Sequence, residues 1–124
     1  MNMKIAAVTE DETTISAHFG RAPFYMVLTV EDDQIVAREK RAKAYHGANE
    51  PHHHSDSAAH HQHGAMIDPI RDCAIVLTRG MGTPAYNSLQ QAGIRPIVTD
   101  VRSIDAAVQA VIADQIVDHP ERLH

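Results

Sequence analysis

The chain has 124 residues, of which 44% are hydrophobic, and this length supports one hydrophobic core, so we expect a single domain over residues 1–124. The net charge is −5 with neutral histidines, and no segment concentrates lysine and arginine, which argues against nucleic acid as a partner. No apolar run approaches the roughly 18 residues that a transmembrane helix needs, so no membrane association is expected.

The only cysteine, Cys73, limits the chemistry that one chain can support. It excludes an intrachain disulfide and a metal site built from cysteines alone. The first eight residues have one basic side chain and too short an apolar run for a signal peptide. These features together favour a reducing, cytoplasmic location.

The N-terminal part of the chain is predicted to form three strands. Residues Met3–Thr9 contain a continuous apolar run, which is typical of a central strand buried on both faces. Residues 24–30 are rich in β-branched and aromatic side chains, and residues 35–41 begin with Ile and Val before becoming charged. Turn residues separate these two runs, so we expect a β-hairpin whose second arm lies toward an edge of the sheet.

The C-terminal part alternates between strand and helix patterns. We expect a strand over residues 74–77, a helix over 84–92 with Thr83 as its N-cap, and a strand over 94–99 after Gly93. Parallel strands with a right-handed crossover are the expected geometry of this unit. Ser103 can cap a last helix over Ile104–Ile112, which carries one apolar stripe. The order β, β-hairpin, β, α, β, α indicates an α/β domain with a mixed sheet.

A histidine-rich segment interrupts this order at about residues 44–64, where no apolar periodicity occurs and a long flexible insertion is expected. Imidazole suits Zn, Ni, Cu and Fe, so this segment predicts binding of a divalent metal. The alternative is a solvated insertion that takes up ions only opportunistically. The candidate metal ligands are His46, His52, His53, His54, His60, His61 and His63.

Three further features are candidates for a binding site. The first is a turn that holds His18, Phe19 and Gly20, although a structural turn histidine is the simpler interpretation. The second is the turn of Gly80, Met81 and Gly82 before a helix N-terminus, where free N–H groups suit an anion. It has neither the Walker lysine nor the third dinucleotide-binding glycine. The third is Cys73, which is more simply interpreted as a small buried hydrophobic residue.

The sequence resembles the dinitrogenase iron–molybdenum cofactor biosynthesis family of small nitrogenase cofactor accessory and carrier domains. The resemblance covers nearly the whole chain outside the histidine-rich segment. It rests on four segments in order: residues 3–9, residues 15–24, residues 73–82, and residues 89–94 with the closing helix.

This resemblance implies a three-layer α/β/α domain with a ribonuclease H-like layout. It also implies that the protein binds a metallocluster, either iron–sulfur or molybdenum-containing, and passes it on without turnover of an organic substrate. By resemblance, His18 and the turn of residues 80–82 would lie near the cluster. One cysteine cannot anchor a four-thiolate cluster, and the histidine-rich segment departs from the common pattern of the family.

The sequence therefore favours two non-catalytic functions over an enzymatic one. The first is a metallocluster or metal-ion carrier that exchanges its cargo with a donor or acceptor protein, as a monomer or weak homodimer. The second is a metal- or pH-responsive interaction module that binds divalent ions through its histidines. A two-metal nuclease is disfavoured because the central strand has no acidic residue, and no nucleophile–base pair is evident, so we expect no enzyme.

Overall fold

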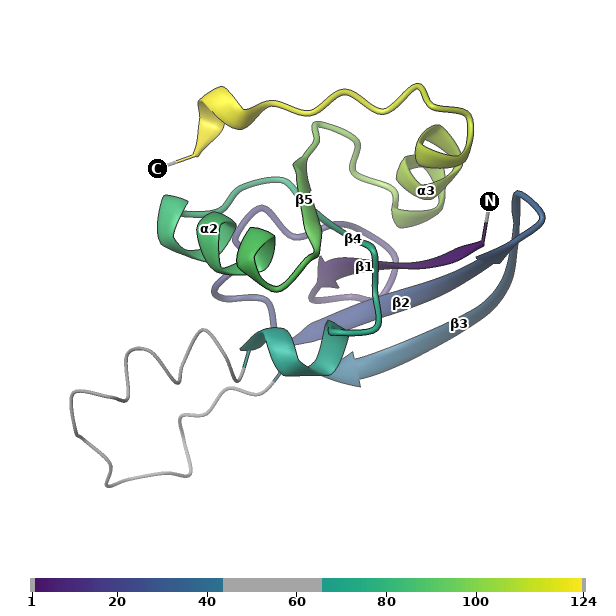
Figure 1. The fold of residues 1–124 in the computed structure, drawn as a ribbon, viewed down its shortest axis with the longest axis horizontal. Coiled ribbons are helices and arrows are strands. Elements are labelled where there is room, and N and C mark those ends of the chain that lie inside the picture. Colours follow the sequence, from purple (N-terminus) through teal and green to yellow (C-terminus); the bar gives the residue numbers. More distant parts are fainter. Residues whose placement is uncertain (1, 44–65, 124) are drawn as a thin grey trace.

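A computed structural model describes residues 2–43 and 66–123, which form one α/β domain around a five-stranded mixed sheet (Figure 1). The sheet order is β3-β2-β1-β4-β5. β1 pairs antiparallel with β2, and β2 with β3, whereas β4 runs parallel to β1 and β5 parallel to β4. The strand bounds are β1 Met3–Thr9, β2 Phe24–Glu31, β3 Gln34–Ala42, β4 Ile75–Thr78 and β5 Arg95–Val98.

The burial of the strands follows their predicted positions in the sheet. Residues 5–8 of β1 are completely buried, since β1 has a strand on each side and packing on both faces. The hairpin of β2 and β3 is confirmed, and it turns at Asp32 and Asp33 with positive φ angles, which suit the twist of a tight β-hairpin. β3 is an edge strand, and most of its side chains are exposed.

Two helices cover opposite faces of the sheet, as Figure 1 shows for α2 (Thr83–Gln91) and α3 (Ile104–Ile112) on either side of β4 and β5. This arrangement confirms the predicted α/β layers, while the ribonuclease H-like comparison stays a prediction. The apolar stripe of α3 is buried as expected, and the Ser103 side chain accepts a hydrogen bond from the Ala106 amide at 3.1 Å. Gly93 ends α2 with a positive φ of 82°.

The predicted N-cap of α2 was wrong by one residue. Gly82 occupies this position in an extended conformation, and no side chain caps the helix. Thr83 and Pro84 form the first turn. No side chain therefore accepts a hydrogen bond from the first amides of this helix.

Two short 3₁₀ turns, η1 (Asp68–Ile70) and η2 (Pro120–Arg122), were not predicted. Each has only three residues, too few to show a periodicity in the sequence. The segment around η1 lies over one face of the hairpin, because the Tyr25 hydroxyl donates to the Met66 carbonyl at 2.7 Å.

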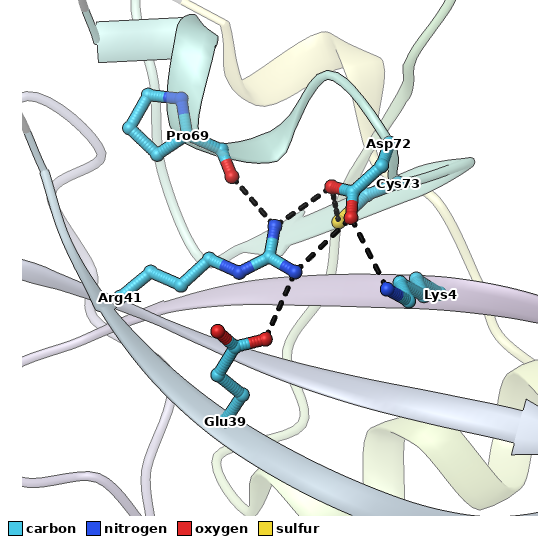
Figure 2. Close-up of polar contacts among 6 residues, drawn as sticks. All are labelled: Lys4, Glu39, Arg41, Pro69, Asp72 and Cys73. Atoms are coloured by element: carbon cyan, nitrogen blue, oxygen red, sulfur yellow. Dashed lines mark hydrogen bonds and ion pairs between the residues drawn. The ribbon is translucent and has the colours of Figure 1, made fainter.

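Ion pairs connect edge strand β3 to other elements on both faces of the sheet. On one face, Arg41 donates to both carboxylate oxygens of Asp72, at 2.7 and 3.0 Å, and to the Pro69 carbonyl at 2.7 Å (Figure 2). On the other face, Arg38 forms a two-oxygen pair with Asp105 at the start of α3. These ion pairs connect β3 to other elements, which its exposed side chains do not do by packing into the core.

The predicted histidine-rich insertion lies outside the described residues. Of the described residues, no helix is long and apolar enough to cross a membrane.

Candidate functional site

The carboxyl ends of β1, β4 and β5 lie at one edge of the sheet because these strands run parallel. The connection after β1 leads toward β2 on one side, whereas the connection after β4 leads to α2 on the other. Open α/β sheets bind ligands at such an edge, where neighbouring connections diverge. The turn of residues 18–20 and the turn of residues 80–82 both lie here, so the structure brings these two predicted elements together.

Backbone hydrogen bonds join these two turns directly. The Arg79 amide donates to the Ser16 carbonyl at 3.0 Å, and the Phe19 amide donates to the Gly80 carbonyl at 3.0 Å. A Cβ atom on Gly80 would lie 2.4 Å from the carbonyl oxygen of Ala17. Glycine is therefore required at position 80 for the close approach of the two turns, which is the physical reason for the motif.

The predicted binding residues of these turns divide by burial into two groups. Phe19 and Met81 are each 2% exposed and belong to the hydrophobic core. His18 and Gly20 are exposed, and Gly82 is half-buried. Only the second group can reach a ligand, while Phe19 and Met81 hold the turns against the sheet.

The electrostatics of the edge suit a negatively charged group in part. The His18 amide donates to the Ser16 hydroxyl at 3.1 Å, and the exposed imidazole forms no hydrogen bond with the described residues. The first amides of α2 follow directly after Gly82 without a side-chain cap. A helix N-terminus carries a partial positive charge, so this edge offers N–H donors and one imidazole to an anion.

Lys43, directly after β3, was missed at the level of sequence. It is 5% exposed, and its ammonium donates to the Phe19 carbonyl. The ammonium also lies 4.4 Å from the centre of the Phe19 ring and 5.5 Å from that of Tyr25. Burial lowers the pKa of Lys43 to about 8. A lysine at the end of a charged edge strand gives no local signal of this role.

We expect Lys43 to make folding stability rise with pH between about pH 8 and pH 10.5. In this window the folded chain has released the Lys43 proton, because its pKa is about 8, whereas the unfolded chain keeps it up to the ordinary value of 10.5. The unfolded state then binds more protons, and stability increases by at most about 1.4 kcal/mol per pH unit. Urea unfolding of the wild type and of Lys43→Met at several pH values measures the difference, and a difference that stays constant from pH 7 to 10 would contradict the assignment.

Cys73 does not join this edge. It precedes β4, whereas Gly80 follows that strand, so the sheet separates the two residues. The thiol is 4% exposed and lies 3.6 Å from a carboxylate oxygen of Asp72 (Figure 2). Burial, with the Asp72 charge, raises the pKa of the Cys73 thiol to about 12. The structure therefore does not bring Cys73 together with His18, and the buried interpretation of the cysteine fits its position.

A consequence for Cys73 is slow alkylation in the folded state. Because the thiolate is the reactive form and its pKa is about 12, iodoacetamide at pH 8 should modify the native chain at least about 100-fold more slowly than the urea-unfolded chain. Intact-mass measurement follows the reaction without ambiguity, since the chain has one cysteine. Equal rates in the two states would show that the thiol is accessible and easily ionised.

The seven histidines predicted to bind metal, His46 to His63, lie outside the described residues. Within residues 2–43 and 66–123, no group of three or more His, Cys, Asp or Glu side chains is arranged to hold a metal ion. The described edge therefore offers hydrogen-bond donors and one imidazole rather than a complete ligand set.

Fold and site together define a single-domain α/β protein whose loops meet at the carboxyl edge of a mixed sheet. The profile of the dinitrogenase iron–molybdenum cofactor family matches residues 1–114, and the chain belongs to this family, as its motifs predicted. No curated protein sequence gave a match.

Solved structures share the fold at low sequence identity. The PH0822 protein is 20% identical, with 96% of each chain covered and a TM-score of 0.72. The MJ0327 protein of Methanocaldococcus jannaschii is 11% identical, with 97% of each chain covered and a TM-score of 0.69. The apo form of the orange protein from Desulfovibrio gigas is 22% identical, over 97% of this chain and 95% of that chain, with a TM-score of 0.66. These similarities bear on the fold alone.

Proposed function

We propose that the chain binds and carries a metallocluster, iron–sulfur or molybdenum-containing, and has no catalytic activity of its own. Membership of the dinitrogenase iron–molybdenum cofactor family supports the kind of cargo. The observation that carries the proposal is the junction of the His18 turn with the Gly80 turn at the carboxyl edge of the sheet. This junction presents His18 and backbone amides to solvent at the place where such sheets hold ligands.

The donor set favours one mode of binding over another. A cluster anchored by cysteine thiolates does not fit, because the one thiol is buried with a pKa of about 12 away from this edge. An anionic cluster held by N–H donors and an imidazole does fit, since both groups lie there. Donors of this kind hold a charged cargo through hydrogen bonds and allow its release to another protein.

Anaerobic purification followed by analysis of iron, molybdenum, copper, zinc, nickel and acid-labile sulfide tests this function. We expect metal together with sulfide in the wild type and a loss of both in His18→Ala. The matched control replaces all seven histidines of residues 46–63 by alanine and should keep the cluster. A wild-type protein that is free of metal and stays colourless after anaerobic reconstitution would overturn the proposal.

A second candidate function is a metal- or pH-responsive interaction module that binds a divalent ion such as Zn, Ni, Cu or Fe through its histidines. Seven histidines within residues 46–63 favour it. It requires stoichiometric divalent metal without inorganic sulfide, and this metal should be lost in the variant that lacks all seven histidines. The same analysis of metal and sulfide therefore separates the two functions.

The partner and the location follow from the first proposal. A carrier needs a donor or acceptor protein for its cluster, and it can work as a monomer or weak homodimer. A cytoplasmic location suits the single reduced cysteine.

A further inference from the structure

One backbone amide in the His18 turn has no acceptor among the described residues. The amides of Phe19, Arg21 and Ala22 all donate to carbonyl oxygens, the first to Gly80 and the other two to His18. The His18 amide donates to a side chain. The Gly20 amide makes no such bond in the described part of the chain, although its four neighbours do. Judged by the described residues, Gly20 is therefore the backbone donor of residues 18–22 that is available to a ligand.

Lys43 determines the direction in which this donor points. Its ammonium binds the Phe19 carbonyl from the buried side, and this carbonyl belongs to the same peptide group as the Gly20 N–H. In a trans peptide the C=O and N–H point in opposite directions. The Gly20 N–H is thus directed away from the core, and Gly20 is exposed, with nothing within 4 Å of a Cβ position.

We infer that the Gly20 N–H binds an anion with oxo or sulfido groups beside His18, and that Lys43 is the positioning residue that aims it. The inference deepens the proposed function and rests on it, because it names the contact that the cargo would make. Lys43 also polarises the shared peptide group through its charge, which strengthens the Gly20 N–H as a donor.

The buried environment of Lys43 agrees with this role. In the described residues no carboxylate pairs with it, and its contacts are the Phe19 carbonyl and the rings of Phe19 and Tyr25. A buried, unpaired ammonium is costly, so its retention needs a compensating contact. The contact that it makes is the one that orients the turn.

Titration of the full-length apo protein with sodium molybdate tests the inference by NMR. Labelling with ¹⁵N-glycine gives at most six amide signals, since the chain has six glycines. The Gly20 signal of the wild type should shift saturably, while that of Gly93 stays in place. Lys43→Met should weaken the binding by at least about tenfold, the loss expected for one hydrogen bond to a charged acceptor.

Two control variants separate positioning from charge and from folding. Lys40 is exposed on β3, lies 4.5 Å from the Phe24 ring centre and pairs with Glu12. Lys40→Met removes the same charge as Lys43→Met, and this variant should bind molybdate within about twofold of the wild type. Gly20→Pro removes the N–H and should not bind molybdate; because this variant also lacks the Gly20 signal, its binding is measured by isothermal titration calorimetry beside the wild type. An unchanged Gly93 signal in each variant reports that the fold is intact.

Each outcome decides for or against the inference. A wild-type Gly20 signal that does not respond to molybdate, or Lys43→Met that binds as the wild type does, would overturn it. If iron, molybdenum and sulfide nevertheless load in the metal analysis, the proposed function stands and only the contact is wrong. If the metal analysis finds no cargo but the Gly20 signal shifts, the anion contact stands and the carrier function is wrong.

Discussion

Replacing Gly80 by alanine is expected to lower the free energy of unfolding by about 3 kcal/mol and to abolish cluster loading. The new Cβ atom would lie 2.4 Å from the Ala17 carbonyl oxygen, which is backbone and cannot move aside alone. Overpacking of this kind costs about 1–3 kcal/mol and forces a backbone shift. The shift would separate Phe19 from the Gly80 carbonyl and so disturb the turn that presents His18. Urea unfolding and metal analysis measure the two effects.

Gly20→Ala is the matched control for this substitution. It adds the same methyl group to the other side of the site, where no atom lies within 4 Å of the new Cβ. Stability should therefore stay within about 0.5 kcal/mol of the wild type. Equal costs for the two variants would show that the close approach at Gly80 is not what limits the junction.

The second large effect is expected at Arg41, whose replacement by methionine should destabilise the fold by about 2 kcal/mol. Arg41 is only 17% exposed and binds Asp72, Glu39 and the Pro69 carbonyl (Figure 2). Methionine keeps the apolar stem but removes the guanidinium from the Pro69 carbonyl and from Glu39, and it leaves Asp72 with Lys4 as its remaining ion-pair partner. Because this cluster joins β3 to the segment around η1, the hairpin should exchange its amide hydrogens faster.

The contribution of Arg41 should also depend on pH. The Arg41 guanidinium holds the pKa of Asp72 well below its usual range. A lowered carboxylate pKa gives stability that is present above the unfolded value of about 3.9 and is lost as the pH falls toward the folded value. The difference between wild type and Arg41→Met should therefore shrink below about pH 4.

Arg38→Met provides the control for Arg41. Arg38 lies on the same strand and also pairs with both oxygens of one carboxylate, but the side chains of Arg38 and Asp105 are 50% and 56% exposed. Exposed pairs contribute about 0.2–1 kcal/mol, so its loss should be small. A double-mutant cycle of Arg41→Met with Asp72→Asn isolates the pair, and coupling no larger than that of Arg38 with Asp105 would refute the assigned importance of the cluster.

The parts of the fold that sequence predicted best are those with a repeated apolar pattern. The buried run of β1 and the apolar stripe of α3 each contain several residues that predict the same element. The 3₁₀ turns have too few residues for a repeated pattern of this kind. The N-cap of α2 was placed one residue late because Thr83 is a common cap, whereas the extended backbone that makes Gly82 the cap is visible only in the structure.

The turns of the candidate site could be named from the sequence, whereas the contacts that support them could not. Glycines and a histidine in short turns are local signals, and backbone hydrogen bonds join these turns in the structure. Lys43 and Phe19 lie 24 positions apart, so their contact has no local trace in the sequence. Cys73 was a separate candidate for a binding site, and β4 between Cys73 and Gly80 puts these two residues at opposite ends of the sheet.

The outer side of β5 limits how copies of this chain can associate. Val98 uses both its outward backbone groups within the chain, since its amide donates to the Asp118 carboxylate at 2.9 Å and its carbonyl accepts from the His119 amide at 2.8 Å. Pro96, the next outward residue, has no N–H. At the opposite side of the sheet, β3 carries charged side chains. Neither border strand is thus a template for the addition of a foreign strand, and self-association into extended sheets is disfavoured by the architecture itself.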